Sequence, residues 1–105
     1  MKKDRATTAG SKPELANLLY AFSDPVRLEI VRQIAERGEV ACGGFGLEIP
    51  KSSLSHHFRV LREAGVIGTR PDGTSLRNFI LRKELNQRFP GMLDSILANV
   101  HPKPK

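Results

Sequence analysis

The chain has 105 residues, which is enough for one domain with a hydrophobic core and too few for two. Its net charge at neutral pH is +6, and its single cysteine excludes an intrachain disulfide framework. No apolar run is long enough to span a bilayer, and the polar start Met1-Lys2-Lys3-Asp4 differs from a secretory segment, so we expect a cytoplasmic protein with no membrane partner.

The charge is unevenly distributed along the chain. Residues 13–50 carry three basic and six acidic side chains, a balance of −3, whereas residues 51–82 carry six basic and two acidic ones, a balance of +4. A basic segment on an acidic neighbour is typical of a surface that faces phosphates. We expect a disordered basic tail over residues 1–10, one domain over 11–100 and a flexible tail over 101–105.

The first predicted element is a short amphipathic helix after Ser11. Ser11-Lys12-Pro13-Glu14 has the pattern of a capping box, with a serine cap, an early proline and a glutamate three residues after the cap. The apolar residues that follow recur at i, i+3, i+4 and i+7: Leu15, Leu18, Leu19 and Phe22. This spacing places them on one face of the helix.

A second helix is predicted to begin at Asp24-Pro25, because an aspartate caps the first N–H groups and proline needs no N–H there. Its inner stripe contains Val26, Ile30 and Ile34, and Gly38 is the predicted C-terminal stop.

The segment over residues 42–50 contains three glycines within four positions. Because each glycine costs a helix about 1 kcal/mol relative to alanine, we expect at most a short, irregular helix. Phe45, Leu47 and Ile49 are the residues expected to anchor it to the core.

The segment from Lys51 to Gly65 predicts an amphipathic helix with one polar, partly basic face. Its inward positions are Leu54, His57, Phe58, Leu61 and Ala64, and its polar stripe contains Ser52, Ser55, His56, Arg59 and Arg62. Short side chains near a helix start can approach base edges in the DNA major groove, while longer basic ones can reach phosphates. We therefore predict a recognition helix in which Ser52, Ser55 and His56 read bases, and Lys51 and Arg59 contact phosphates.

The two adjacent histidines of this segment are predicted to differ in role. Neighbouring helix residues point about 100° apart, so the pair makes a poor chelate. His57 lies on the apolar stripe and is predicted to be a core histidine with a hydrogen-bond partner rather than a ligand. His56 lies on the polar stripe and is predicted to contact DNA, and the alternative is a surface residue without a role.

After Gly65 the periodicity changes from helical to alternating, which indicates a hairpin. Residues 66–70 read as a strand, Pro71-Asp72-Gly73 as a turn, and residues 76–81 as the returning strand. Arg70 and Arg77 flank its tip and are expected to contact phosphates or the minor groove. The order of helices and hairpin predicts a mainly α fold with a small β-hairpin, a winged helix-turn-helix.

The chain ends with a predicted short helix over residues 83–88 and a longer one that starts at Phe89-Pro90. The apolar stripes at the two ends of the chain exceed what a small domain readily buries, so we expect a homodimer through the terminal helices. The alternative is that both helices cap the core of a monomer. The expected interface consists of Leu15, Leu18, Leu19, Phe22, Phe89, Met92, Leu93, Ile96 and Leu97.

Residues 24–30, 52–67 and 89–93, together with the Gly73-Thr74 wing tip, resemble the ArsR family of bacterial winged-helix repressors. The resemblance covers roughly residues 13–99. It implies a homodimer that binds a palindromic operator, represses transcription and is released by an inducer. It also implies that Lys51, Ser52, Ser55 and His56 occupy the DNA-contacting positions of the recognition helix.

The chain departs from the metal-sensing members of that family. Some of those members carry a Cys-x-Cys core, whereas Ala41-Cys42 offers one thiol. Others carry Asp/His and His/Glu pairs on the last helix, whereas this chain has only Asp94 and the distal His101. A tight site for such metals needs three or four converging ligands, so no metal is expected. Cys42 is expected to be a small buried residue, and a redox or metalloid switch at Cys42 is the alternative.

Catalytic motifs are lacking in the sequence. No nucleophile, base and orienting group come together, and the glycines at 43, 44 and 46 lack the context and lysine of a nucleotide site. We therefore expect a regulator without enzymatic activity or cofactor, whose partners are double-stranded operator DNA, a second copy of the chain and an unidentified inducer. A winged-helix module that binds another protein is the remaining alternative.

Overall fold

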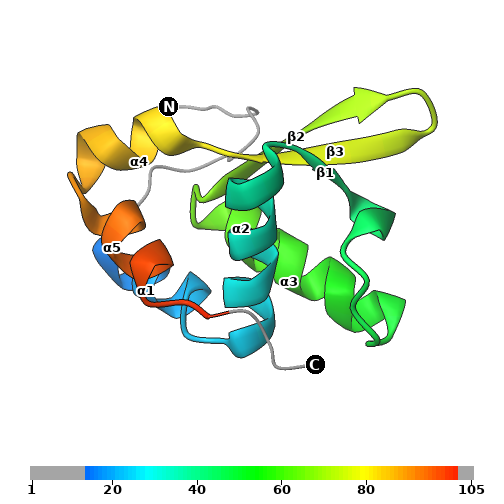
Figure 1. Ribbon diagram of the computed structural model, residues 1–105, viewed down its shortest axis with the longest axis horizontal. Coiled ribbons are helices and arrows are strands. Elements are labelled where there is room, and N and C mark those ends of the chain that lie inside the picture. Colours follow the sequence, from blue (N-terminus) through cyan, green and yellow to red (C-terminus); the bar gives the residue numbers. More distant parts are fainter. Residues whose placement is uncertain (1–13, 102–105) are drawn as a thin grey trace, which may run out of the picture.

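The computed structural model describes residues 14–101 and shows a body of helices from which a β-hairpin wing projects (Figure 1). The elements in chain order are α1 (Leu15–Ala21), α2 (Pro25–Arg37), β1 (Val40–Ala41), the 3₁₀ turn η1 (Cys42–Gly44), α3 (Lys51–Glu63), β2 (Ile67–Asp72), β3 (Ser75–Ile80), α4 (Arg82–Arg88) and α5 (Met92–Ala98). This order confirms the mainly α winged helix-turn-helix fold. No helix in this part of the chain is both long and apolar enough to cross a membrane.

The start of α1 differs from the predicted capping box. Glu14 is the N-cap, with extended backbone at φ −122° and ψ 148°, and its side chain makes no capping hydrogen bond. Its carbonyl accepts the first helical hydrogen bond, from Leu18 N at 2.8 Å. Glu14 therefore precedes the helix instead of lying in its first turn, and the prediction for it is wrong. Ser11 and Pro13 lie outside the described residues, as do the predicted tails except His101.

The predicted boundaries of α2 are confirmed. Asp24 Oδ1 accepts hydrogen bonds from the N–H groups of Val26 at 2.7 Å and Arg27 at 3.3 Å, with Pro25 in the first turn. At the other end, Gly38 adopts φ 91° and donates its N–H to Ile34 O. Residues with a Cβ rarely adopt that conformation, so glycine suits this stop.

The wing is part of a three-stranded antiparallel sheet with strand order β1-β3-β2. The sequence did not predict β1, which has only two residues and pairs Val40 with Asn78. The predicted turn is also misplaced, because Pro71 and Asp72 belong to β2 and pair with Leu76 and Ser75. The connection is Gly73-Thr74. β2 is an edge strand, where a proline without an N–H is tolerated.

The helices and the sheet enclose one hydrophobic core, with Leu18, Ile30, Ile34, Leu61, Ile67 and Leu85 among its fully buried residues. Leu18, Phe22 and Leu93, three residues of the predicted dimer interface, belong to this core. They lie there because α1 and α5 pack against the body of the same protomer (Figure 1), so they offer little surface to a second copy, and their place in a dimer interface stays a prediction. Leu15 and Leu19 are exposed, while Phe89, Met92, Ile96 and Leu97 are partly buried.

The last helix begins at Met92, three residues later than predicted. Phe89 has a non-helical backbone, and Gly91 adopts the left-handed conformation at φ 79°, so the chain turns between α4 and α5. Both helices have seven residues, and the predicted longer last helix is wrong. Arg82 Nη1 and Asp94 Oδ1, 3.0 Å apart, join the two helices.

Candidate nucleic-acid interface

Helix α3 presents a continuous polar face to solvent. Its buried side consists of Phe58, Val60 and Leu61, and the Phe58 ring lies 5.5 Å from the Phe45 ring in the preceding loop. The predicted stripe lies on the opposite side, where the exposed residues are Lys51, Ser52, Ser55, His56 and Arg59. Arg62, further along, is half-buried. The predicted start and the polar face of this helix are therefore confirmed, whereas the helix ends at Glu63, two residues before the predicted Gly65.

Four side chains of this face have no hydrogen-bond or ion-pair partner elsewhere in residues 14–101. Lys51, Ser52, Ser55 and Arg59 make no side-chain hydrogen bond or ion pair with another described residue. Their donors and acceptors are therefore available to an external ligand. The N-terminal end of α3 and the tip of the wing lie toward the same end of the molecule in Figure 1.

The two wing arginines, in contrast, are held by acidic side chains. Arg70 and Arg77 lie directly opposite each other in β2 and β3. Arg70 Nη2 and Nε donate to the two carboxylate oxygens of Glu39, at 2.7 and 3.2 Å. Arg77 lies 3.5 Å from the same carboxylate and 3.6 Å from Asp72. The hydrogen bond from Arg70 holds the pKa of Glu39 below its usual value.

His57 is enclosed between α3 and the start of α2. Its Nδ1 lies 3.1 Å from Arg27 Nη1 and 4.0 Å from Asp24 Oδ1. Burial is the main cause that lowers the pKa of His57, and the Asp24 carboxylate opposes it. The prediction of a core histidine with a hydrogen-bond partner is therefore confirmed, whereas the DNA contact of exposed His56 stays a prediction.

Cys42 lies in η1 beside the sheet, where its thiol is half-buried. Asn78 Nδ2 donates to Cys42 Sγ at 3.4 Å and to Val40 O at 3.1 Å, and Asn78 Oδ1 has no hydrogen-bond partner in the described part of the chain. Nothing in this environment pairs the thiol with a second one, so the redox switch stays a prediction. Between residues 14 and 101, no three His, Cys, Asp or Glu side chains converge as a metal site.

Sequence reasoning missed two residues that organise this surface. Glu39 follows the helix stop, and its role becomes visible only when the fold brings Arg70, 31 residues later, beside it. Arg27 is 4% exposed, although it is charged. A signal for Arg27 was present, because it lies three residues before Ile30 and therefore on the apolar side of α2.

The sequence and the fold are similar to those of known regulators. Residues 22–70 match the model of a helix-turn-helix domain. The chain is 38% identical over 85 residues to YceK, an HTH-type transcriptional regulator of Bacillus subtilis, and the alignment covers 77% of this chain and 84% of that protein.

Two solved structures have a similar fold. The crystal structure of the transcriptional repressor BigR from Xylella fastidiosa aligns with a TM-score of 0.58 and 32% identity, over 71% of this chain and 85% of that one. An ArsR-like transcriptional regulator from Rhodococcus sp. RHA1 aligns with a TM-score of 0.60 and 25% identity, over 80% and 84% of the two chains. Together with the helix-turn-helix match and the winged fold, these similarities show that the chain belongs to the ArsR family of winged helix-turn-helix transcriptional regulators.

Proposed function

We propose that the protein is a homodimeric repressor that binds an inverted-repeat operator, with one α3 helix in each of two successive major grooves. The observation that carries this proposal is the exposed face of α3, whose lysine, serine and arginine side chains make no hydrogen bond or ion pair with another described residue. The names of the relatives, which are regulators and repressors and not enzymes, support a binding protein. The cytoplasmic location that such a function requires belongs to the same proposal.

Within this proposal, the length of each side chain on α3 determines whether it contacts bases or phosphates. Ser52, Ser55 and His56 are short enough to meet base edges, where hydrogen bonds distinguish one sequence from another. Lys51 and Arg59 contact phosphates, which add affinity and fix the position of the helix without reading sequence. Arg70 and Arg77 reach the flanking minor groove or its phosphates from the wing.

The second copy is proposed to pack on α1 and α5. Leu15 and Leu19 are 47% and 52% exposed, and Tyr20 beside them is 56% exposed. Leu19 also lines a groove of about 370 Å³ between α1, α2 and α5, together with Phe22, Leu28, Ser95, Ile96, Asn99 and Val100. Exposed apolar side chains beside an apolar groove favour a self-complementary interface of the kind that two-fold dimers use.

The experiment that tests the function begins with selection of duplexes from a random-sequence pool by the purified full chain. We expect an inverted repeat to be enriched, and light scattering to give the mass of a dimer that shifts this duplex. Leu19→Glu is expected to give a monomer with weaker operator binding. A wild-type monomer that enriches no sequence would contradict the proposal and favour a module that binds another protein.

A further inference from the structure

Arg27 is a buried cation in the body of the protein. It lies in the first turn of α2, is 4% exposed and directs its guanidinium group at three acceptors. Nε donates to Ala21 O at 2.8 Å, Nη2 donates to Tyr20 O at 3.0 Å, and Nη1 lies 3.1 Å from His57 Nδ1. The Tyr20 ring lies 5.0 Å from the guanidinium carbon.

None of these partners is a carboxylate. Asp24 lies 4.0 Å from His57, and its Oδ1 caps α2 by accepting from Val26 N and Arg27 N. Burial of a cation costs free energy unless hydrogen bonds compensate for lost water, and an apolar residue of similar volume often stabilises a core as well or better. The contribution of Arg27 therefore depends on the segments of the chain that its hydrogen bonds connect.

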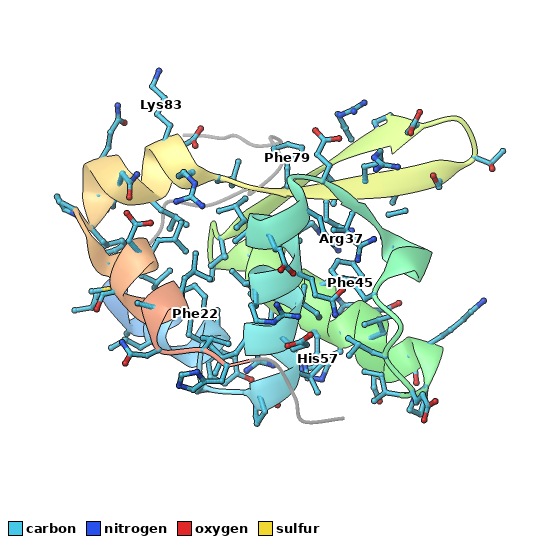
Figure 2. The ribbon with its side chains drawn as sticks, viewed as in Figure 1. Phe22, Arg37, Phe45, His57, Phe79 and Lys83 are labelled. Atoms are coloured by element: carbon cyan, nitrogen blue, oxygen red, sulfur yellow. The ribbon has the colours of Figure 1, made fainter. Side chains whose placement is uncertain are left out.

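The three acceptors belong to two different helices. Tyr20 O and Ala21 O are carbonyls at the C-terminal end of α1, whereas His57 is on α3, and Figure 2 shows the His57 side chain beside α2. Arg27 therefore joins the helix that we propose for dimerisation to the helix that we propose for reading DNA. His56, the next residue on α3, lies on the exposed side of that helix.

The contact also fixes the protonation state of His57. An arginine guanidinium is always a donor, so Nδ1 must offer a lone pair and the ring proton must lie on Nε2. A second proton on the ring would remove the acceptor and place two cations about 3 Å apart. The link between Arg27 and α3 thus exists only while His57 is neutral.

We propose that Arg27 is a positioning residue for operator recognition, which orients α3 relative to α1 through neutral His57. This inference rests on the function proposed above and extends it with a specific coupling between the two helices. Protonation of His57 releases α3 from Arg27, and operator binding weakens as a consequence.

The groups that face His57 set the pH at which this release occurs. Burial, the positive charge of Arg27 on α2 and the neighbouring His56 on α3 all lower the pKa of His57, whereas Asp24 at the N-cap of α2 raises it. From α1 the cluster receives only two carbonyls and the Tyr20 ring. Because the pKa lies below the usual 6.5, the link is intact at neutral pH and is lost as the pH falls through the lowered value.

The test measures affinity for the selected duplex and for a scrambled duplex by fluorescence anisotropy between about pH 5 and 8, the range in which a histidine titrates. Wild-type protein is expected to lose operator affinity at the acidic end, although its rising positive charge strengthens binding to scrambled DNA. In His57→Asn the amide oxygen takes the place of Nδ1 and cannot titrate, so the acidic loss should disappear. In the matched control His101→Asn, which removes an exposed histidine outside the proposed interface, the acidic loss should remain.

A second variant tests Arg27 directly at neutral pH. Arg27→Met keeps most of the side-chain volume but has no donors, and we expect about a tenfold loss of operator affinity with scrambled binding retained. Arg27→Lys, which keeps the charge but not the three-way geometry, should fall between Arg27→Met and wild type. Circular dichroism and thermal unfolding show whether each variant is folded.

The possible results separate this inference from the function on which it rests. If wild type selects no duplex, the proposed function fails. If wild type binds the operator without an acidic loss, if His57→Asn keeps that loss, or if folded Arg27→Met binds as tightly as wild type, the positioning role is overturned. Should Arg27→Met fail to fold, the comparison of His57→Asn with His101→Asn decides the question.

Discussion

Helix α3 and the wing both carry basic side chains, but these side chains differ in their partners. Lys51 and Arg59 on α3 are exposed and have no ion pairs within residues 14–101. Arg70 and Arg77 on the wing share the carboxylate of Glu39, and Arg77 also lies near Asp72. Helix α3 can therefore meet phosphates without breaking a contact, whereas the wing must exchange a carboxylate for a phosphate.

The exchange limits how much free energy the wing can add to DNA binding. Exposed ion pairs contribute little free energy, because water screens the charges whether or not DNA is bound. The wing therefore gains only the difference between a phosphate and a carboxylate partner. The difference between the two regions predicts that α3 supplies sequence discrimination and most of the affinity, and that the wing adjusts affinity.

The largest effect is expected from the double variant Ser55→Ala/His56→Ala on α3. Each base-edge contact is worth about 1–3 kcal/mol of discrimination, so the ratio of affinities for the selected and scrambled duplexes should fall by roughly 30-fold or more. Anisotropy titrations on both duplexes measure this ratio. Binding to the scrambled duplex should change little, because neither residue is assigned to a phosphate. An unchanged ratio would show that α3 does not read the operator.

Much of α3 and α2 could be predicted because their signals are local. Asp24-Pro25 and Gly38 terminate α2 through hydrogen bonds and backbone angles that involve neighbours in sequence. The burial of Phe58 and Leu61 follows from a 3.6-residue period that the sequence displays. The same period placed His57 inward, and its partner Arg27 supplies the hydrogen bond that a partly buried imidazole requires.

The parts that could not be predicted depend on contacts between distant residues. A two-residue strand such as β1 has no visible alternation, and its pairing with Asn78 exists only in the folded sheet. Leu18 and Leu19 are equally apolar, yet the first is buried and the second exposed, because that outcome depends on how α1 packs. The ion pairs of Glu39 likewise required knowledge of where β2 and β3 lie.

A smaller effect is expected from the removal of one wing cation in Arg77→Ala. Loss of one phosphate contact should reduce the slope of log K against log salt by about 1 and weaken binding to both duplexes by a similar factor of several-fold. Lys83→Ala is the matched control, because Lys83 is an exposed cation on α4, away from the wing tip in Figure 2. Equal slopes for the two variants would remove Arg77 from the interface.

The smallest effect, and the one with the opposite sign, is expected from Glu39→Gln. Loss of the carboxylate releases Arg70 and Arg77 and removes a charge that repels phosphates, so affinity should rise about two- to fivefold at low salt. Glu36→Gln is the matched control, since it removes the same charge from an exposed position where Glu36 pairs with Arg32. The rise should be constant across about pH 5 to 8, because Arg70 keeps the pKa of Glu39 below 4.5 and the carboxylate stays ionised throughout. Weaker binding by Glu39→Gln would mean that the carboxylate holds the two arginines in their DNA-binding positions. Glu39 would then preorganise the wing for DNA instead of competing with phosphates for its arginines.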